Sequence, residues 1–414
     1  MTRPSAAEKY LALYAEPETR FQHRFENTYN HSLVIPAYRE EASRVRKVWR
    51  SLPSSTLVIL VLNARQAPDI EAQDLFTTLT ADRQKTQVDR GISLHCRDGE
   101  PDLLIVDRFS EGRTIPEKTG VGLARKIGHD IALKLSQDQV VISNWLFTTD
   151  ADAILPQDYF DITPAATDTA RVCPFRHEAR DGLDIPVLLY EIYLLYYAAA
   201  LRAAGSPYAY PTVGSTIACQ VEAYASVRGY PKRATGEDFY LLNKLCKLGT
   251  VATPAMSPVI LEGRLSTRVP VGTGQAVAAI DLLTDPLAQY GFEHPDCFRR
   301  LADLLTFISE LSDRQPEQCL HPDPIIQRFC ESSGLLSQYH NKKAQQPSPA
   351  VMLKFLTDWF DGLRTRQFIR FCRDDCFGTI PVSSLAESDL VSIPWQGISS
   401  LTAVRNRLSQ LVYS

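Results

Sequence analysis

Short apolar runs alternate with stretches of helical periodicity through the first half of the chain. The clearest run is Thr56–Leu62, which is apolar throughout, as expected of a parallel strand covered on both faces. Similar runs stand at Ser32–Pro36 and Leu103–Asp107, and Glu40–Leu52 has helical spacing between the first two. Strand, helix and strand at this spacing predict a right-handed βαβ unit. The pattern as a whole is typical of an α/β nucleotide-binding domain.

The same reasoning places the other elements and the domain boundaries. Further helices are expected at Ala6–Tyr14, Asp69–Thr86, Gly120–Leu135, Ile185–Ala204 and Thr235–Leu245, and further strands at Trp145–Phe147, Val172–Phe175, Thr216–Gln220, Val251–Thr253 and Val259–Leu261. The periodicity beyond residue 275 is mainly helical. We therefore predict an N-terminal helical extension (1–27), an α/β domain with a mostly parallel central sheet (28–275) and a helical C-terminal region (276–414).

The stretch Asn144–Asp152 ends an apolar strand on two carboxylates, Asp150 and Asp152. Ligands of open α/β sheets bind beyond the carboxyl ends of the strands, where these acids should lie. Residues i and i+2 of extended backbone point the same way, so both carboxylates could reach one divalent cation, Mn²⁺ or Mg²⁺. The alternative is that the two acids only cap the next turn.

Other polar residues follow neighbouring strands and are candidates for binding a nucleotide. Pro36, Ala37, Tyr38 and Glu40 lie at the end of the first strand, and Asn63 ends the second. The base and ribose of a nucleotide could be bound at these strand ends.

Glu237 and Asp238 begin a predicted helix directly after a glycine, where one carboxylate could face a substrate hydroxyl. The alternative for this pair is favourable charge at a helix N-terminus. Four cations are candidate phosphate partners: Arg125, Lys126, Arg264 and Arg268. For Arg268 a surface salt bridge is an equal alternative.

Bulk properties exclude several classes of protein. The formal net charge of -4 gives no reason to expect nucleic acid as a partner. Scattered cysteines favour reduced thiols and a cytoplasmic location, with peripheral membrane contact as an alternative. No secretory signal is expected, because Met1–Arg20 is polar and lacks an apolar segment. No membrane span is expected, because Ile185–Ala204 contains Glu191 and Arg202. We expect this tyrosine-rich helix to be buried or to line a groove, with contact to a lipid acceptor as the alternative. The pattern leaves homo-oligomerisation open.

Three blocks resemble the signature blocks of family-2 glycosyltransferases, in the same order and at similar spacing. They are Ser32-Leu-Val-Ile-Pro-Ala-Tyr-Arg-Glu-Glu41, Thr148-Thr-Asp-Ala-Asp-Ala153 and Gly236-Glu-Asp-Phe-Tyr-Leu-Leu-Asn-Lys-Leu245. The block Gly120–Gly128 resembles the glycine-rich helix that precedes the Asp-x-Asp strand in that family. The resemblance covers roughly residues 30–275.

The resemblance implies a GT-A fold and an inverting transfer from a nucleotide-diphosphate sugar. It implies that Asp152 is the principal metal ligand, that Asp150 contacts the ribose or the metal, and that Asp238 of the Glu237–Asp238 pair is the catalytic base. It also implies that Pro36–Glu40 contact the nucleobase. Asn63 departs from the acidic ending that many members have here, which leaves the nucleobase open.

Two other functions are kept beside this one. A nucleotidyltransferase that makes the sugar nucleotide would also use Asp-bound Mg²⁺, but no glycine-rich phosphate loop follows the first strand. A catalytically silent nucleotide-sugar-binding scaffold is disfavoured by the presence of Asp150, Asp152 and Asp238 together. The absence of a Q-x-x-R-W block argues against a processive synthase. The acceptor is left as a glycan, a small molecule or a lipid-linked molecule.

Overall fold

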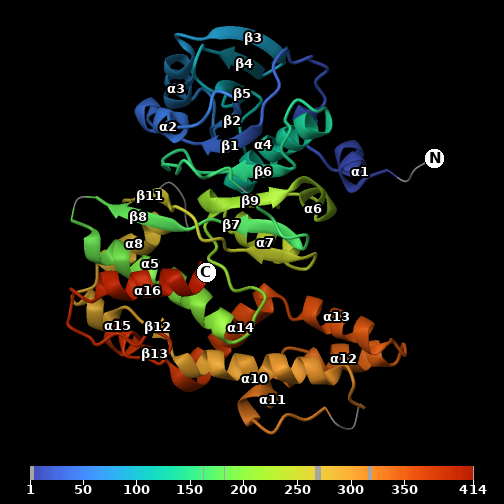
Figure 1. Ribbon diagram of the computed structural model, residues 1–414, viewed down its shortest axis with the longest axis vertical. Coiled ribbons are helices and arrows are strands. Elements are labelled where there is room, and N and C mark those ends of the chain that lie inside the picture. Colours follow the sequence, from blue (N-terminus) through green and yellow to red (C-terminus); the bar gives the residue numbers. More distant parts are fainter. Residues whose placement is uncertain (1–3, 162, 181, 266–271, 316–318, 414) are drawn as a thin grey trace. The chain divides into compact units, whose positions relative to one another are not determined.

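The computed structural model describes residues 4–161, 163–180, 182–265, 272–315 and 319–413 (Figure 1). The chain divides into two compact units. Unit 1 holds the described residues of Met1–Asp184, Thr212–Ala278 and Tyr413–Ser414, and unit 2 holds Ile185–Pro211 and Ala279–Val412. The division near residue 278 lies close to the predicted boundary at 275. It differs in assigning 185–211 to the second unit and in leaving 1–27 inside the first.

Unit 1 is built on a mixed, nine-stranded sheet of the described residues, in the order β10-β7-β9-β6-β1-β2-β5-β4-β3. Its strands are β1 (His31–Ala37), β2 (Thr56–Asn63), β3 (Gln84–Asp89), β4 (Ile92–Cys96), β5 (Asp102–Arg108), β6 (Trp145–Thr148), β7 (Asp168–Val172), β9 (Ile217–Gln220) and β10 (Thr250–Ala252). The central strands β6, β1, β2 and β5 are parallel. Antiparallel pairs flank them on both sides. The α/β prediction with a parallel centre is therefore confirmed.

The helices of unit 1 are α1 (Ala6–Leu13), α2 (Ala42–Trp49), α3 (Ile70–Thr80), α4 (Gly120–Gln137), α6 (Val221–Ser226), α7 (Glu237–Leu245) and α8 (Thr273–Asp281), which runs across the division between the units. Of these, α3 and α4 pack on the central strands. Every residue of β2 is buried, because helices cover both faces. Helix α4 lies very close to β1, since a Cβ on Gly128 would stand 2.3 Å from Val34 Cγ1. Parallel strands β8 (Phe175–Ala179) and β11 (Val259–Gly263) form a small second sheet.

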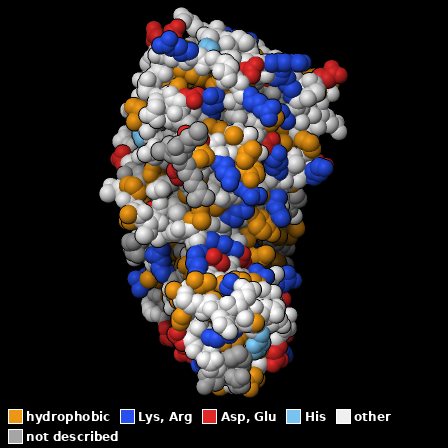
Figure 2. Space-filling model, turned by 90° about the vertical axis from the view of Figure 1, so that its right-hand side faces the viewer, with side chains coloured by type: hydrophobic (Ala, Val, Ile, Leu, Met, Phe, Trp, Pro, Cys, Tyr) orange, Lys and Arg blue, Asp and Glu red, His pale blue; other side chains and the backbone are white. Residues whose placement is uncertain are grey.

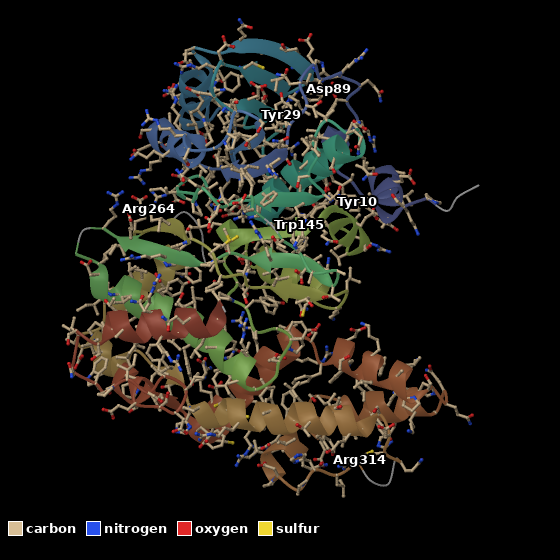
Figure 3. The ribbon with its side chains drawn as sticks, viewed as in Figure 1. Tyr10, Tyr29, Asp89, Trp145, Arg264 and Arg314 are labelled. Atoms are coloured by element: carbon tan, nitrogen blue, oxygen red, sulfur yellow. The ribbon has the colours of Figure 1, made fainter. Side chains whose placement is uncertain are left out.

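The N-terminal helix α1 is part of the core of unit 1. The Tyr10 hydroxyl, on the inner side of α1, donates to Asp130 Oδ1 of α4 at 2.6 Å (Figure 3). The Ser5 hydroxyl accepts from the Glu8 N–H and the Glu8 carboxylate accepts from the Ser5 N–H, so a capping box fixes the start of the helix. Buried hydrogen bonding across 120 residues explains why 1–27 do not form a separate extension.

Two predicted elements are wrong. Helix α3 ends at Thr80, and 84–96 form the antiparallel hairpin β3–β4, which the expected helix Asp69–Thr86 overran. The hairpin turns at Gly91, whose φ of 81° suits glycine. The expected strand Val172–Phe175 is instead the junction of β7 and β8, and β7 lies between β9 and β10.

Unit 2 is mainly helical, as predicted for the C-terminal region. Its elements are α5 (Asp184–Ala203), α9 (Pro286–Gln289), β12 (Phe292–Glu293), α10 (Pro295–Leu311), α11 (Pro324–Ser332), α12 (Leu335–Lys343), α13 (Pro349–Trp359), α14 (Gly362–Cys372), β13 (Thr379–Ile380), α15 (Val382–Ala386) and α16 (Leu401–Val412). Among the described helices, α5 alone is long and apolar enough to cross a membrane, and 61% of its apolar window is buried. The buried Glu191 carboxylate of α5 pairs with Arg405 of α16, which suits a core helix.

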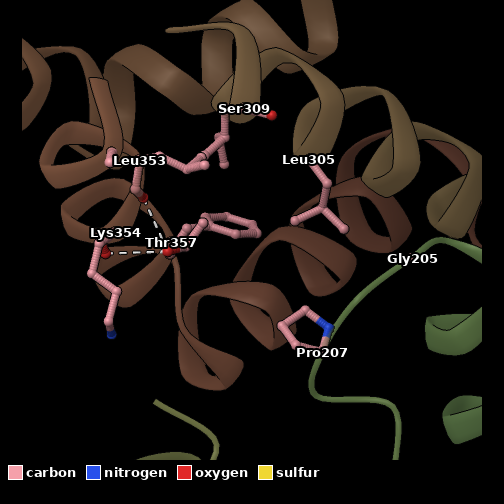
Figure 4. Close-up of a pocket in the computed structure, with 10 residues that line it drawn as sticks. Gly205, Pro207, Leu305, Ser309, Leu353, Lys354 and Thr357 are labelled. Carbon is pink, nitrogen blue, oxygen red and sulfur yellow. Dashed lines mark hydrogen bonds between the residues drawn. The ribbon is translucent and has the colours of Figure 1, made fainter. Parts of the chain in front are cut away.

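An apolar pocket of about 450 Å³ opens in unit 2 between α10 and α13 (Figure 4). Leu305, Leu353 and Phe360 line it, and the Thr357 hydroxyl donates to the carbonyl of Leu353 at 3.0 Å. The one titratable residue of its lining, Lys354, pairs with Asp358. The lining is mainly apolar, so the pocket suits an apolar group.

Candidate functional site

The guanidinium of Arg125, on α4, joins the end of β6 to the start of α7. Its Nη2 donates to Asp150 Oδ1 at 2.5 Å, its Nη1 to Thr148 Oγ1 at 2.9 Å and its Nε to Glu237 Oε1 at 3.1 Å. Arg125 is 3% exposed, so these contacts form away from water. The carboxylates of Asp150 and Glu237 are thereby held at the carboxyl edge of the central parallel strands, where α/β sheets bind ligands.

Glycine at two positions brings α7 to this place. The Gly122 N–H donates to the Arg233 carbonyl at 3.0 Å, and a Cβ on Gly122 would stand 2.5 Å from the Pro231 carbonyl oxygen. Gly236 has a φ of 70°, a left-handed conformation that glycine adopts without strain. The glycine-rich start of α4 therefore serves close packing against the segment that leads into Glu237.

The two acids at the start of α7 differ in exposure. Glu237 is buried, whereas Asp238 is partly exposed and its Oδ1 accepts the Phe239 N–H at 2.7 Å. Burial and the neighbouring Asp238 raise the pKa of Glu237, while Arg125 opposes them. Burial also raises the pKa of Asp238, against the Phe239 N–H and Arg125. A carboxylate with a raised pKa is a stronger base, and Asp238 is the more exposed residue of the pair.

Asp150 and Asp152 lie in a turn after β6, so the predicted extended geometry is wrong. The strand ends at Thr148, and the Ala153 N–H donates back to the Asp150 carbonyl at 3.4 Å. The Asp150 and Asp152 side chains are 42% and 21% exposed, so both carboxylates are accessible from solvent. They pair with different arginines, Arg125 and Arg264, because the turn separates their directions.

Arg264, directly after β11, ties Asp152 to a second set of acids (Figure 3). Its Nη2 donates to Asp152 Oδ2 at 2.9 Å and to both Glu40 carboxylate oxygens at 3.2 Å. Its Nε stands 3.2 Å from Glu262 Oε2. The predicted phosphate partner Arg264 and the predicted nucleotide contact Glu40 are therefore neighbours of Asp152.

The predicted nucleotide contacts lie at the ends of β1 and β2. Asn63 is 8% exposed, and within the described part of the chain its Oδ1 has no hydrogen-bond partner. The Tyr38 ring is flanked by the guanidinium of Arg65, 5.3 Å from its centroid. Pro36 and Ala37 are buried residues at the end of β1. An unpaired buried amide oxygen suits a ligand that donates a hydrogen bond.

Lys126 is a correction to the predicted set. Its ammonium donates to Asp130 Oδ2 at 2.7 Å, to the Tyr14 carbonyl at 3.1 Å and to the Tyr10 hydroxyl. Consecutive residues of a helix point about 100° apart, so Arg125 faces the site while Lys126 faces α1. Arg125 donates to three protein acceptors, two of them carboxylates, so it positions the acids of the site rather than acting as a dedicated phosphate partner. Arg268 lies outside the described residues.

Two residues that the sequence did not single out belong to the site. Thr148 accepts from Arg125, and Gly214 lies over the guanidinium, since a Cβ there would stand 2.8 Å from Arg125 Nη2 and 3.5 Å from Asp238 Oδ2. Gly214 could have been noticed in the sequence because it is a glycine in the loop that leads into β9. Gly214 and Arg65 lie between the sequence blocks, whereas Thr148 is the first residue of the block Thr148–Ala153.

Across the ranges that the structure describes, no group of three or more His, Cys, Asp or Glu side chains is arranged to hold a metal ion. Asp150 and Asp152 offer carboxylate oxygens, which hard divalent cations prefer. A cation on Asp152 would compete with Arg264.

Comparisons with solved structures add a distant likeness. No family model and no curated protein matches the chain. Among solved structures, the chain is similar to the mannosyltransferase PcManGT from Pyrobaculum calidifontis, solved in complex with GDP-Man and Mn²⁺. The identity is 12%, the TM-score is 0.33, and the match covers 98% of this chain and 91% of that one. At this distance the likeness does not assign an activity, so the functional argument stands on the residues of the site.

Proposed function

We propose that this protein is a metal-dependent, inverting glycosyltransferase that moves a sugar, of the hexose class, from a nucleotide-diphosphate donor to an acceptor hydroxyl. The observation that supports this most is the grouping of acids around Arg125. Asp150 follows a parallel strand, Glu237 and Asp238 begin a helix, and one buried guanidinium bonds to both segments. The proposal gives the sequence blocks Thr148–Ala153 and Gly236–Leu245 one shared site.

Asp152 would be the principal ligand of Mn²⁺ or Mg²⁺ through its carboxylate oxygens, and Asp150, in the same turn, would contact this cation or the donor ribose. When bound, the cation supplies Lewis-acid stabilisation of the diphosphate as negative charge develops on it. Arg264 contacts Asp152 at 2.9 Å, so it is placed to exchange this carboxylate for a donor oxygen. The Asn63 amide oxygen would accept a hydrogen bond from the nucleobase or ribose, with Tyr38 and Glu40 beside it.

Asp238 would act as the base. Its carboxylate accepts the proton of the acceptor hydroxyl while that oxygen bonds to the anomeric carbon. The bond from this carbon to the diphosphate breaks at the same time, and the diphosphate leaves with the electron pair. One displacement on the face opposite the leaving group inverts the anomeric carbon. Glu237 and Arg125 contribute by positioning the start of α7.

Calorimetric titration tests the donor site. UDP, GDP and their sugars are titrated with and without Mn²⁺ into wild type, Asp152→Asn and the matched control Asp161→Asn, an exposed acid outside the site. Binding of one nucleotide that needs Mn²⁺, is lost in Asp152→Asn and is kept in Asp161→Asn would support the proposal. Binding that ignores both the metal and Asp152 would contradict it.

A turnover assay separates the proposed enzyme from the two alternatives. Release of nucleoside diphosphate from the bound donor is expected, because water can replace the acceptor slowly. Donor binding without release at any acceptor would favour a silent binding protein. Release of pyrophosphate from a nucleoside triphosphate and a sugar phosphate would favour a nucleotidyltransferase.

A further inference from the structure

Three cations of unit 1 form a basic surface outside the candidate site. Arg228 follows α6, Arg233 lies in the segment before α7, and Lys244 lies in the last turn of α7. The two arginines are exposed, and Lys244 is half-buried. The Lys244 ammonium donates to the Val227 carbonyl at 3.1 Å, which places it beside Arg228. We call Arg228, Arg233 and Lys244 the basic surface.

No carboxylate of the described residues pairs with any of these three cations. The neighbouring Lys232 does have a partner, Glu16, at 2.6 Å, and is therefore not counted with them. Burial together with the charges of Arg228, Lys126 and Arg233 lowers the pKa of Lys244. The charges around the Lys244 ammonium are thus positive, and an anion from outside the described residues would relieve their repulsion.

Aromatic rings hold the two arginines in place. The Arg228 guanidinium lies 4.6 Å from the centroid of the Tyr14 ring, and the Arg233 guanidinium lies 4.0 Å from that of Tyr240. Stacking of this kind keeps a guanidinium ordered while its N–H groups remain directed to solvent. The cations are therefore partly preorganised, and they stand next to tyrosines, which favour membrane–water interfaces.

Large apolar side chains are exposed beside the same cations. Leu13 and Tyr14, at the end of α1, are 65% and 37% exposed, and Leu248, one turn after Lys244, is 53% exposed. Figure 2 shows Lys and Arg side chains gathered in the middle of the face on which α1 and α6 lie, with hydrophobic side chains among them. A site for a soluble phosphate would need the cations but not the exposed leucines. A lipid surface uses both.

We propose that the basic surface docks the protein on a membrane that carries anionic phospholipids. The cations lie at the headgroup phosphates, and Leu13, Tyr14 and Leu248 enter the interfacial layer. A cation near such a membrane contributes about 1 kcal/mol, which is about five-fold in binding, so three contribute on the order of 100-fold. The proposal does not depend on the donor site or on the proposed sugar transfer.

Co-sedimentation of the full chain with vesicles tests this proposal. We compare phosphatidylcholine vesicles with vesicles of phosphatidylcholine and phosphatidylserine. The test variant is Arg228→Gln/Arg233→Gln/Lys244→Gln, and the control is Lys47→Gln/Arg50→Gln/Arg90→Gln, which removes the same charge from exposed positions elsewhere in unit 1. Wild type and control should bind the anionic vesicles, more weakly at high salt. The test variant should bind on the order of 100-fold more weakly.

A second variant tests the apolar part. Leu13→Ser/Leu248→Ser keeps every charge, and it should weaken binding while leaving the salt dependence as in wild type, because burial of apolar side chains is not screened by salt. Thermal unfolding of each variant confirms that it is folded.

Three results would overturn the proposal. The first is no binding of wild type to anionic vesicles at low salt, and the second is an equal loss of binding in the test and control variants. The third is binding to heparin or to inorganic phosphate that the test variant loses, without vesicle binding by wild type. That last outcome would assign the basic surface to a soluble anion.

Discussion

Arg125 on α4 and Glu237 at the start of α7 form a buried ion pair, with Nε 3.1 Å from Oε1. The two side chains are 3% and 6% exposed, and 112 residues separate them along the chain. A buried charge is tolerated only when its partner is in place. This pair therefore fixes where α7, and with it Asp238, stands relative to the end of β6.

Replacing Arg125 should destabilise the protein strongly. Arg125→Met removes the cation and leaves Glu237 buried beside Asp150 without a counter-charge, and we expect a loss of about 3–5 kcal/mol in the free energy of unfolding. The double variant Arg125→Met/Glu237→Gln should recover part of this loss, because no uncompensated charge then remains at Glu237. Urea denaturation of the two variants and of wild type measures both quantities.

The matched control is Arg97→Met, which breaks the exposed pairs of Arg97 with Asp82 and Glu100. We expect a loss below about 1 kcal/mol there, since surface ion pairs are screened by water. Equal losses in the two methionine variants would show that burial of the Arg125 pair has no special importance.

Much of the fold could be predicted from local pattern. Strand β2 is continuously apolar and buried throughout, so its type and its place at the centre of the sheet follow from the sequence. The hairpin β3–β4 was missed because β3 is almost entirely exposed and has no apolar face to reveal its period. The position of Ile185–Pro211 in the second unit depends on contacts such as Glu191 with Arg405, which lie 214 residues apart.

The sequence pointed to most of the acids that the structure groups around Arg125 and Arg264, but not to their pairings. The blocks at Asp150 and Glu237 were found because the acids stand at the ends of recognisable elements. Their common partner could not be chosen, since Arg125 and Lys126 are adjacent and only their helical directions distinguish them. The turn after Thr148 also could not be predicted, because no residue there marks the end of the strand, and the two acids were therefore expected to continue in extended backbone.

Enlarging Gly128 should strain the contact between α4 and β1. A Cβ there would stand 2.3 Å from Val34 Cγ1, so Gly128→Ala should cost about 1–3 kcal/mol in the free energy of unfolding. Val34→Ala removes the opposing methyl groups, and the double variant should be more stable than the sum of the two single losses predicts. Additive losses in denaturant titrations would contradict the close contact.

His129 should make the stability depend on pH. Burial lowers the pKa of His129 to about 3, and its Nε2 has no partner among the described residues. An unfolded histidine has a pKa of about 6.5, so between these values the unfolded state binds the proton and the folded state does not. The stability that neutral His129 confers is present above pH ~6.5 and falls with pH by about 1.4 kcal/mol per pH unit.

The variant His129→Phe isolates this contribution. It keeps an aromatic ring beside Tyr224 and Tyr230 but cannot bind a proton. Between pH 7 and pH 5 it should lose about 2 kcal/mol less stability than wild type, and between pH 8 and pH 7 the two should change alike. A residual dependence is expected, because burial also lowers the pKa of His95. Identical pH profiles would rule out a neutral, buried His129.

If the proposed sugar transfer is right, substitution of Asp238 should mainly reduce turnover, and substitution of Glu237 should mainly reduce stability. Asp238→Asn keeps the shape of the side chain and removes the base, so turnover should fall by about 10²–10⁴-fold while the affinity for the nucleotide sugar is retained. Glu237→Gln leaves the base in place but weakens its tie to Arg125. We expect it to lower the free energy of unfolding and to reduce turnover less.

Steady-state kinetics, calorimetry of donor binding and urea denaturation of the two variants separate these effects. Asn can still accept the Phe239 N–H through its amide oxygen, so Asp238→Asn should remain as stable as wild type or become more stable. The attacking hydroxyl gives up its proton only to the deprotonated carboxylate, so the rate of Asp238→Asn should also lose any rise with pH that depends on this carboxyl. If Asp238→Asn turned over at the wild-type rate, the proton would have to be taken by another group, and Glu237 would be the nearest candidate.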